Sequence, residues 1–168
     1  MAETRAWLDA TVIGLNLCPF ARAARDGNLI RFVVSDAASA PALRAALVVE
    51  LRLLETLDPL RTDTTLLIHP LALGDFLDYN DFLGTADDAI EELGMSGTFQ
   101  IASFHPRYQF AGEKADDPAN RSNRSPYPML QLLREASVRR ALEGYPGDPA
   151  DIPRRNIERL RREAGEKS

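Results

Sequence analysis

Apolar residues recur along the chain in two patterns, which predict short strands separated by longer helices. Three short apolar runs, at 29–35, 64–68 and 98–104, are typical of strands that are covered on both faces. Elsewhere, apolar residues recur at the three- and four-residue spacing of a helix with one buried face. The helices predicted from this spacing cover 2–14, 20–25, 39–58, 73–93, 128–143 and the segment from 151 to the tail at 165.

The predicted order of elements is α-β-α-β-α-β-α-α, and this order determines the expected fold class. Strands that alternate with helices require crossover connections, which favour parallel pairing. We therefore expect an α/β fold with a small, mainly parallel sheet of about three or more strands and with helices packed on it. At 168 residues, the whole chain (1–168) is expected to form a single domain.

Composition and charge exclude several classes of protein. The formal net charge is −5, so no general field attracts nucleic acid. The first residues include Glu3 and Asp9 and lack the basic-then-apolar layout of a signal peptide, and no apolar run approaches the ~20 residues of a membrane span. A single cysteine rules out an internal disulfide and a multi-cysteine zinc site. We expect a cytoplasmic protein that binds neither nucleic acid nor membrane.

The residues that follow the three predicted strands form the first candidate site. Asp36, His69 and His105 lie at these strand ends, and both histidines precede proline. If the strands are parallel, all three residues emerge at the carboxyl edge of the sheet, where α/β proteins bind ligands. Two imidazoles and a carboxylate suit one transition-metal ion, or the histidines could act as acid and base. The alternative is that each side chain only hydrogen-bonds its own loop.

Cys18, which also precedes a proline, is the second candidate for chemistry. It could join the histidines as a metal ligand, or serve as a nucleophile with His105 as base or cationic partner. The alternative is a buried thiol with a structural role. The expected catalytic residues are therefore His105, Cys18 and His69, and the expected metal ligands are His69, His105 and Asp36.

The polar loop at 105–128 supplies the expected substrate-binding residues. Asn123, Arg124 and Ser125 precede a predicted helix, where amides, a hydroxyl and a guanidinium could bind an anion. A simple helix cap explains Ser125 equally well, but it does not explain Arg124. Tyr108 and Gln109 could orient a substrate, or they could fill the underside of the loop.

Five blocks stand out in order along the chain: VIGLNLCPF (12–20), DFLDYNDF (75–82), FQIASFHP (99–106), YQF (108–110) and NRSPYP (123–128). Together they resemble an uncharacterised bacterial family, the domain of unknown function 1415 (DUF1415). The resemblance covers nearly the whole chain and implies no activity. The chain departs from it at Gln131, just before the motif Leu-Leu-Arg-Glu, where histidine is expected in many relatives; this weakens any role for a third imidazole.

These observations favour an enzyme, for example a hydrolase or an oxidoreductase, that acts on a small polar or anionic molecule at the strand carboxyl ends. Two alternatives stay open. One is a module that binds a ligand or a metal without turnover. The other is a subunit that assembles, for instance as a homo-oligomer, through its charged helices: the segment 73–93 is acidic and the last helix is basic.

Overall fold

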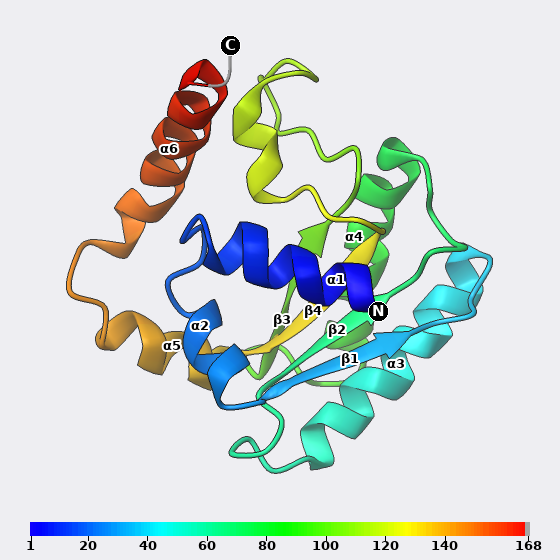
Figure 1. The fold of residues 1–168 in the computed structure, drawn as a ribbon. Coiled ribbons are helices and arrows are strands. Elements are labelled where there is room, and N and C mark those ends of the chain that lie inside the picture. Colours follow the sequence, from blue (N-terminus) through cyan, green and yellow to red (C-terminus); the bar gives the residue numbers. More distant parts are fainter. Residues whose placement is uncertain (167–168) are drawn as a thin grey trace.

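A computed structural model describes residues 1–166 as a four-stranded sheet with helices on both faces (Figure 1). The strands are β1 (Ile30–Val34), β2 (Thr64–Ile68), β3 (Phe99–Phe104) and β4 (Met129–Arg134). The α-helices are α1 (Ala2–Trp7), α2 (Ala21–Asp26), α3 (Ala40–Thr56), α4 (Phe76–Glu92), α5 (Glu135–Glu143) and α6 (Ile152–Glu166). A π-helix, η1 (Leu8–Ile13), continues α1, and two 3-10 helices, η2 (Pro118–Ser122) and η3 (Pro149–Asp151), complete the structure.

The sheet has the strand order β1-β2-β4-β3. β1 pairs in parallel with β2, whereas β4 pairs antiparallel with both β2 and β3. β1, β2 and β3 therefore run in the same direction, and their carboxyl ends lie at one edge of the sheet. The α/β class is confirmed, but the sheet is mixed rather than mainly parallel, because β4 lies between β2 and β3.

The fourth strand occupies residues that the sequence pattern assigned to a helix. The predicted helix at 128–143 is wrong over its first part, since Met129–Arg134 forms β4 and only Glu135–Glu143 forms α5. Met129, Leu130 and Leu132 are completely buried. A strand that is covered on both faces lacks the polar alternation by which strands are recognised, and its leucines imitate a helical stripe.

The main core lies between the sheet and the helices α3 and α4. Successive residues of a strand point to opposite faces of a sheet, and Leu67 and Leu130 point to this face. The predicted helix start at Ser39 is confirmed, because its Oγ accepts a hydrogen bond from the Ala42 N–H. The buried stripe of α3 includes the predicted Leu43, Leu47, Leu51 and Leu54.

The opposite face of the sheet is covered by α1 and η1, and α6 stands at the side of the molecule (Figure 1). Arg5 of α1 lies 4.0 Å from the ring centroid of Phe32 in β1. Leu8, Val12 and Ile13 of η1 form a small buried cluster. Within residues 1–166, no helix is both long enough and apolar enough to cross a membrane.

Gly14 allows the π-helix η1 to end in turns whose hydrogen bonds span five residues. The N–H of Gly14 donates to Asp9 O, and the N–H of Leu17 donates to Val12 O, each five residues back. A Cβ atom at position 14 would lie only 2.3 Å from Ala10 O, a backbone atom that cannot rotate away. Any side chain at this position would therefore force the π-turn to change.

We expect Gly14→Ala to lower the free energy of unfolding by about 2 kcal/mol, because a methyl group forced into a packed site costs roughly 1–3 kcal/mol. Gly84→Ala is the matched control. Gly84 lies inside α4 with nothing within 4 Å of an added Cβ, so alanine should stabilise the helix there by up to about 1 kcal/mol. Thermal unfolding followed by circular dichroism tests the opposite signs. Equal changes in Tm for the two variants would contradict the role of Gly14.

Candidate functional site

The carboxyl edge of the sheet brings the two histidines close to each other. His69 follows β2 and His105 follows β3, and both side chains are completely buried. Tyr79 of α4 lies between them, with its ring centroid 5.9 Å from that of His69 and 5.0 Å from that of His105. The expectation that both histidines share one sheet edge is therefore met, but the edge is packed under α4 rather than open.

Both ring nitrogens of His105 are occupied by the backbone. Nδ1 accepts the Arg107 N–H at 3.0 Å, so Nε2 carries the proton and donates it to Leu73 O at 3.2 Å. Burial lowers the pKa of His105, and the neighbouring Arg107 acts in the same direction. His105 is thus a neutral imidazole whose hydrogen bonds hold two loops together.

One ring nitrogen of His69 has no hydrogen-bond partner in the part of the chain that the structure describes. Its Nδ1 lies 3.1 Å from Ala72 O and donates to it. Its Nε2 is buried with no hydrogen-bond partner among the described residues. Burial lowers the pKa of His69 to about 4, more than the hydrogen bond to Ala72 raises it, and His105 nearby adds to the lowering. At neutral pH, His69 is therefore uncharged.

The metal triad expected from His69, His105 and Asp36 is not formed. Asp36 is exposed, whereas both histidines are buried under α4. In residues 1–166, no group of three or more His, Cys, Asp or Glu side chains could hold a metal ion. The strands do end at a common edge, but a common edge does not aim side chains at a common point. The expected ligand set is corrected accordingly.

Cys18 lies on the other face of the sheet. Its side chain packs against the buried cluster that contains Leu8 and Val12, and it does not lie beside the histidines. Burial raises the pKa of its thiol, and the backbone N–H groups of Phe20 and Ala21 offset this only in part. Cys18 is therefore a protonated thiol without an imidazole beside it.

The expected anion-binding residues Asn123, Arg124 and Ser125 stabilise their own loop. The Asn123 side chain donates to Ser103 O at 3.0 Å. Arg124 Nε donates to Tyr108 O at 3.0 Å, and its terminal nitrogen donates to Ala115 O at 2.5 Å. Ser125 Oγ donates to Tyr127 O at 2.7 Å; it precedes a strand and not the predicted helix. These donors are used within the protein.

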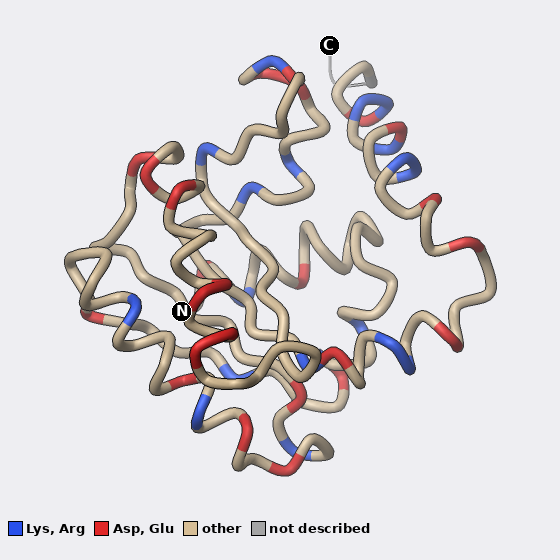
Figure 2. Tube along the Cα trace, turned by 180° about the vertical axis from the view of Figure 1, so that it is seen from behind, with Lys and Arg blue, Asp and Glu red and all other residues tan. Residues whose placement is uncertain are grey.

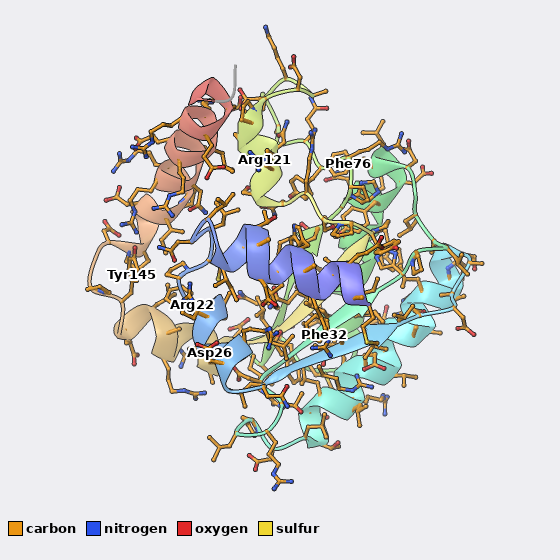
Figure 3. The ribbon with its side chains drawn as sticks, in the orientation of Figure 1. Arg22, Asp26, Phe32, Phe76, Arg121 and Tyr145 are labelled. Atoms are coloured by element: carbon orange, nitrogen blue, oxygen red, sulfur yellow. The ribbon has the colours of Figure 1, made fainter. Side chains whose placement is uncertain are left out.

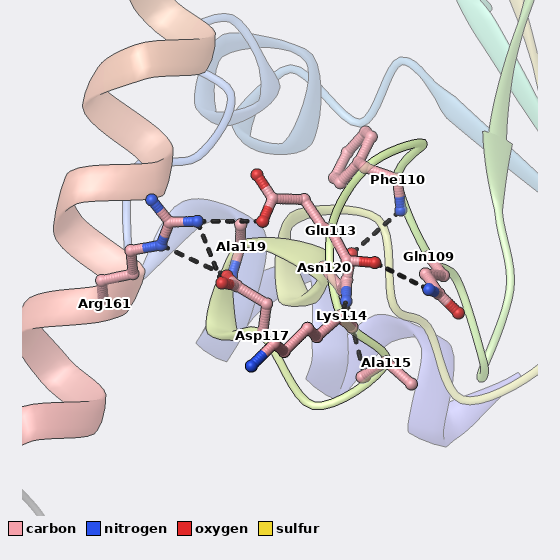
Figure 4. Close-up of polar contacts among 9 residues, drawn as sticks. All are labelled: Gln109, Phe110, Glu113, Lys114, Ala115, Asp117, Ala119, Asn120 and Arg161. Carbon is pink, nitrogen blue, oxygen red and sulfur yellow. Dashed lines mark hydrogen bonds and ion pairs between the residues drawn. The ribbon is translucent and has the colours of Figure 1, made fainter.

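Tyr108 and Gln109 also support the loop at 105–128. The Tyr108 hydroxyl lies 3.3 Å from Ser103 Oγ, and Gln109 Nε2 donates to Glu113 O at 2.7 Å. Figure 4 shows Asn120 bonded to the loop backbone and Arg161 of α6 reaching across to the loop. The basic helix α6 is thus held by acidic side chains of this loop, Glu113 and Asp117.

A cavity of about 900 Å³ lies on the face of the sheet that carries α1. We call it the sheet cavity. Its floor is formed by β2, β3 and β4, and its walls by η1, α2, α5, α6 and the loop at 110–123. Its apolar lining includes Trp7, Leu8, Val12, Phe20, Ala24, Phe104, Phe110, Val138, Ala141, Ile152 and Ile157.

The floor of the sheet cavity carries polar side chains, among them Thr64, Gln100 and Gln131. Gln131 lies opposite Ala102 and Gln100 opposite Leu133, so the two glutamines are diagonal neighbours on one face. Gln131 Nε2 donates to Thr64 Oγ1 at 3.2 Å, and this hydroxyl donates to Leu132 O. No hydrogen bond to the Gln100 side chain is formed within residues 1–166. Carboxamides offer both donors and acceptors.

Comparison with known proteins decides the family but not the activity. A family model described as "Protein of unknown function (DUF1415)" matches residues 1–168. The chain belongs to the DUF1415 family. Neither the curated proteins nor the solved structures include one that matches it. The resemblance seen in the sequence blocks is thus confirmed over the whole chain.

The sheet cavity of this DUF1415 chain was missed by reasoning from the sequence. The sequence marks Gln131 only as a departure from histidine, and Gln100 only as part of a strand. One signal was present: both glutamines interrupt strands that are mainly apolar, and they lie on the same face once β4 is recognised as a strand. Histidine at the position of Gln131 would lie on the cavity floor, and not beside His69 and His105.

Proposed function

We propose that this DUF1415 protein binds a small, mostly apolar molecule in the sheet cavity. One observation carries the proposal: a space of about 900 Å³ with an apolar lining and a few polar groups on its floor. Ligand pockets typically measure roughly 300–1,000 Å³ and combine apolar walls with a few polar groups that orient the ligand. The lining of the sheet cavity matches this description.

The sheet cavity is open to solvent, since Gln100 on its floor is exposed, and part of its apolar lining therefore contacts water. Moving apolar surface out of water is favourable. Val138 of α5 and Ile157 of α6 face this space and are only half-buried. A bound molecule with an apolar surface would shield these side chains from water.

Binding is favoured over catalysis by the residues of the lining. Cys18 is the thiol among them, and burial raises its pKa. The acids Glu113 and Asp63 are engaged by Arg161 and Ser137. The described lining contains no histidine that could act as a base. The non-catalytic ligand-binding alternative therefore has more support than the His/Cys enzyme.

Ala141→Trp tests the proposal, because it places an indole in the cavity from the wall formed by α5. The neutral fluorescent dye N-phenyl-1-naphthylamine serves as the probe ligand. We expect the unmodified protein to bind the dye with micromolar affinity and Ala141→Trp to weaken binding at least about tenfold, since the indole occupies the same space.

Ala136→Trp is the matched control for this experiment. Ala136 lies on the same helix but is exposed and does not line the cavity. This variant should retain the dye affinity of the unmodified protein. If the unmodified protein fails to bind the dye, or if both tryptophan variants bind it equally well, the proposal does not hold.

A further inference from the structure

A second, smaller pocket opens beside the sheet cavity and is lined by basic groups. It measures about 50 Å³ and lies between the turn that follows η1 and the first turns of α6. Pro19, Ile152 and Asn156 line both spaces, so the two are neighbours that share a wall. We call this space the arginine pocket, because Arg155 and Arg159 of α6 line it.

Arg155 and Arg159 line this pocket and have no acidic partner among the described side chains. Elsewhere on α6, Arg154 pairs with Asp151 and Glu158, and Arg161 pairs with Glu113 and Asp117. Among the side chains that the structure describes, no carboxylate lies within ion-pair distance of Arg155 or Arg159. Glu163, one turn beyond Arg159, is held by Arg121 at 3.7 Å. Figure 2 shows basic residues recurring along α6.

The two guanidinium groups are positioned by neutral contacts. Arg155 lies 5.5 Å from the ring centroid of Tyr145, which Figure 3 shows on the segment between α5 and α6. Arg159 donates a hydrogen bond to Leu15 O. The two residues are four positions apart on one helix, so their side chains are neighbours and their like charges repel. An anion between them would remove this repulsion.

We infer that the ligand of the sheet cavity is amphipathic, with an apolar body in the cavity and one anionic group bound by Arg155 and Arg159. The inference rests on the proposed function. Guanidinium groups bind carboxylate and phosphate oxygens through pairs of N–H donors. A pocket of about 50 Å³ is large enough for one such group and too small for the body of the ligand.

Two dyes with the same aromatic body test this assignment. 8-Anilino-1-naphthalenesulfonate differs from N-phenyl-1-naphthylamine by one sulfonate, which stands for the anionic group. At low ionic strength, we expect the unmodified protein to bind the anionic dye about tenfold more tightly than the neutral dye, as a charge-assisted hydrogen bond would produce. In the double variant Arg155→Gln/Arg159→Gln, this preference should disappear while the affinity for the neutral dye stays unchanged.

Arg154→Gln/Arg162→Gln is the matched control, because it removes the same net charge from the same helix at residues that do not line the pocket. It should keep the preference for the anionic dye. If Arg155→Gln/Arg159→Gln keeps the preference, or if the control loses it equally, the inference is overturned even though the cavity binds the neutral dye. Failure of the neutral dye to bind would instead overturn the proposed function.

Discussion

Replacing Tyr79 by phenylalanine is expected to lower the free energy of unfolding by about 4 kcal/mol. The hydroxyl of this completely buried side chain donates to Met129 O at 2.7 Å and accepts the Phe104 N–H at 2.9 Å. It therefore joins the end of β3 to the start of β4. Phenylalanine would leave both backbone groups without a partner, and each unsatisfied buried group costs roughly 1–3 kcal/mol.

Urea unfolding followed by the fluorescence of Trp7, the single tryptophan, measures this change. Tyr127→Phe is the matched control. The Tyr127 hydroxyl bonds to Glu3 in an exposed contact, so its loss should change the free energy of unfolding by no more than about 0.5 kcal/mol. If both variants lose the same stability, the bridge through Tyr79 does not hold the two strands together.

The contacts of Tyr79 also assign a role to the carboxyl edge of the sheet. His69 and His105 flank its ring, Phe76 packs against both Tyr79 and His105, and the histidines hydrogen-bond to loop carbonyl groups. This arrangement resembles a polar core more than an active site. The residues that the sequence suggests for chemistry here thus stabilise the junction of β2, β3 and β4.

Local signals in the sequence predict most of the elements correctly. β2 lies at the predicted 64–68, and Ser39 caps α3 as expected. These features depend on a few adjacent residues, such as a cap or a short apolar run. The acidic segment at 73–93 also forms a helix, α4, although its first turn starts only after Asp75.

Features that depend on distant pairing could not be predicted in the same way. β4 is a strand because it lies between β2 and β3, with Met129 opposite both Ile68 and Phe104. Its own residues do not distinguish a strand from a helix. The sheet cavity depends on where α5 and α6 lie relative to the sheet, and the chain encodes this only through long-range contacts, such as Asn156 to Leu17 O. The sequence does predict that His69 and His105 share one edge of the sheet, because this depends only on the direction of the strands that they follow.

The protein is expected to lose about 3 kcal/mol of stability between pH 7 and pH 4 through His69. Burial lowers the pKa of His69 from 6.5 to about 4 in the folded state. In this range the unfolded chain binds a proton that the folded protein does not bind, so acid favours unfolding. The stability due to the neutral imidazole is fully present above pH 6.5 and declines as the pH falls toward 4. His105, whose pKa burial also lowers, changes stability in the same direction.

Urea unfolding at several pH values between 7 and 4.5 measures how the free energy of unfolding depends on pH. This pH range separates the effect of His69 from the titration of carboxylates. The pKa values of Asp75 and Asp117 are lowered in the folded state, Asp75 mainly by backbone N–H groups and Asp117 mainly by Arg161. Their contributions are lost only below pH 3.8. His69→Gln should remove most of the dependence, whereas His105→Gln should keep the part due to His69. A free energy of unfolding that stays constant from pH 7 to pH 4.5 would show that His69 is not held neutral by burial.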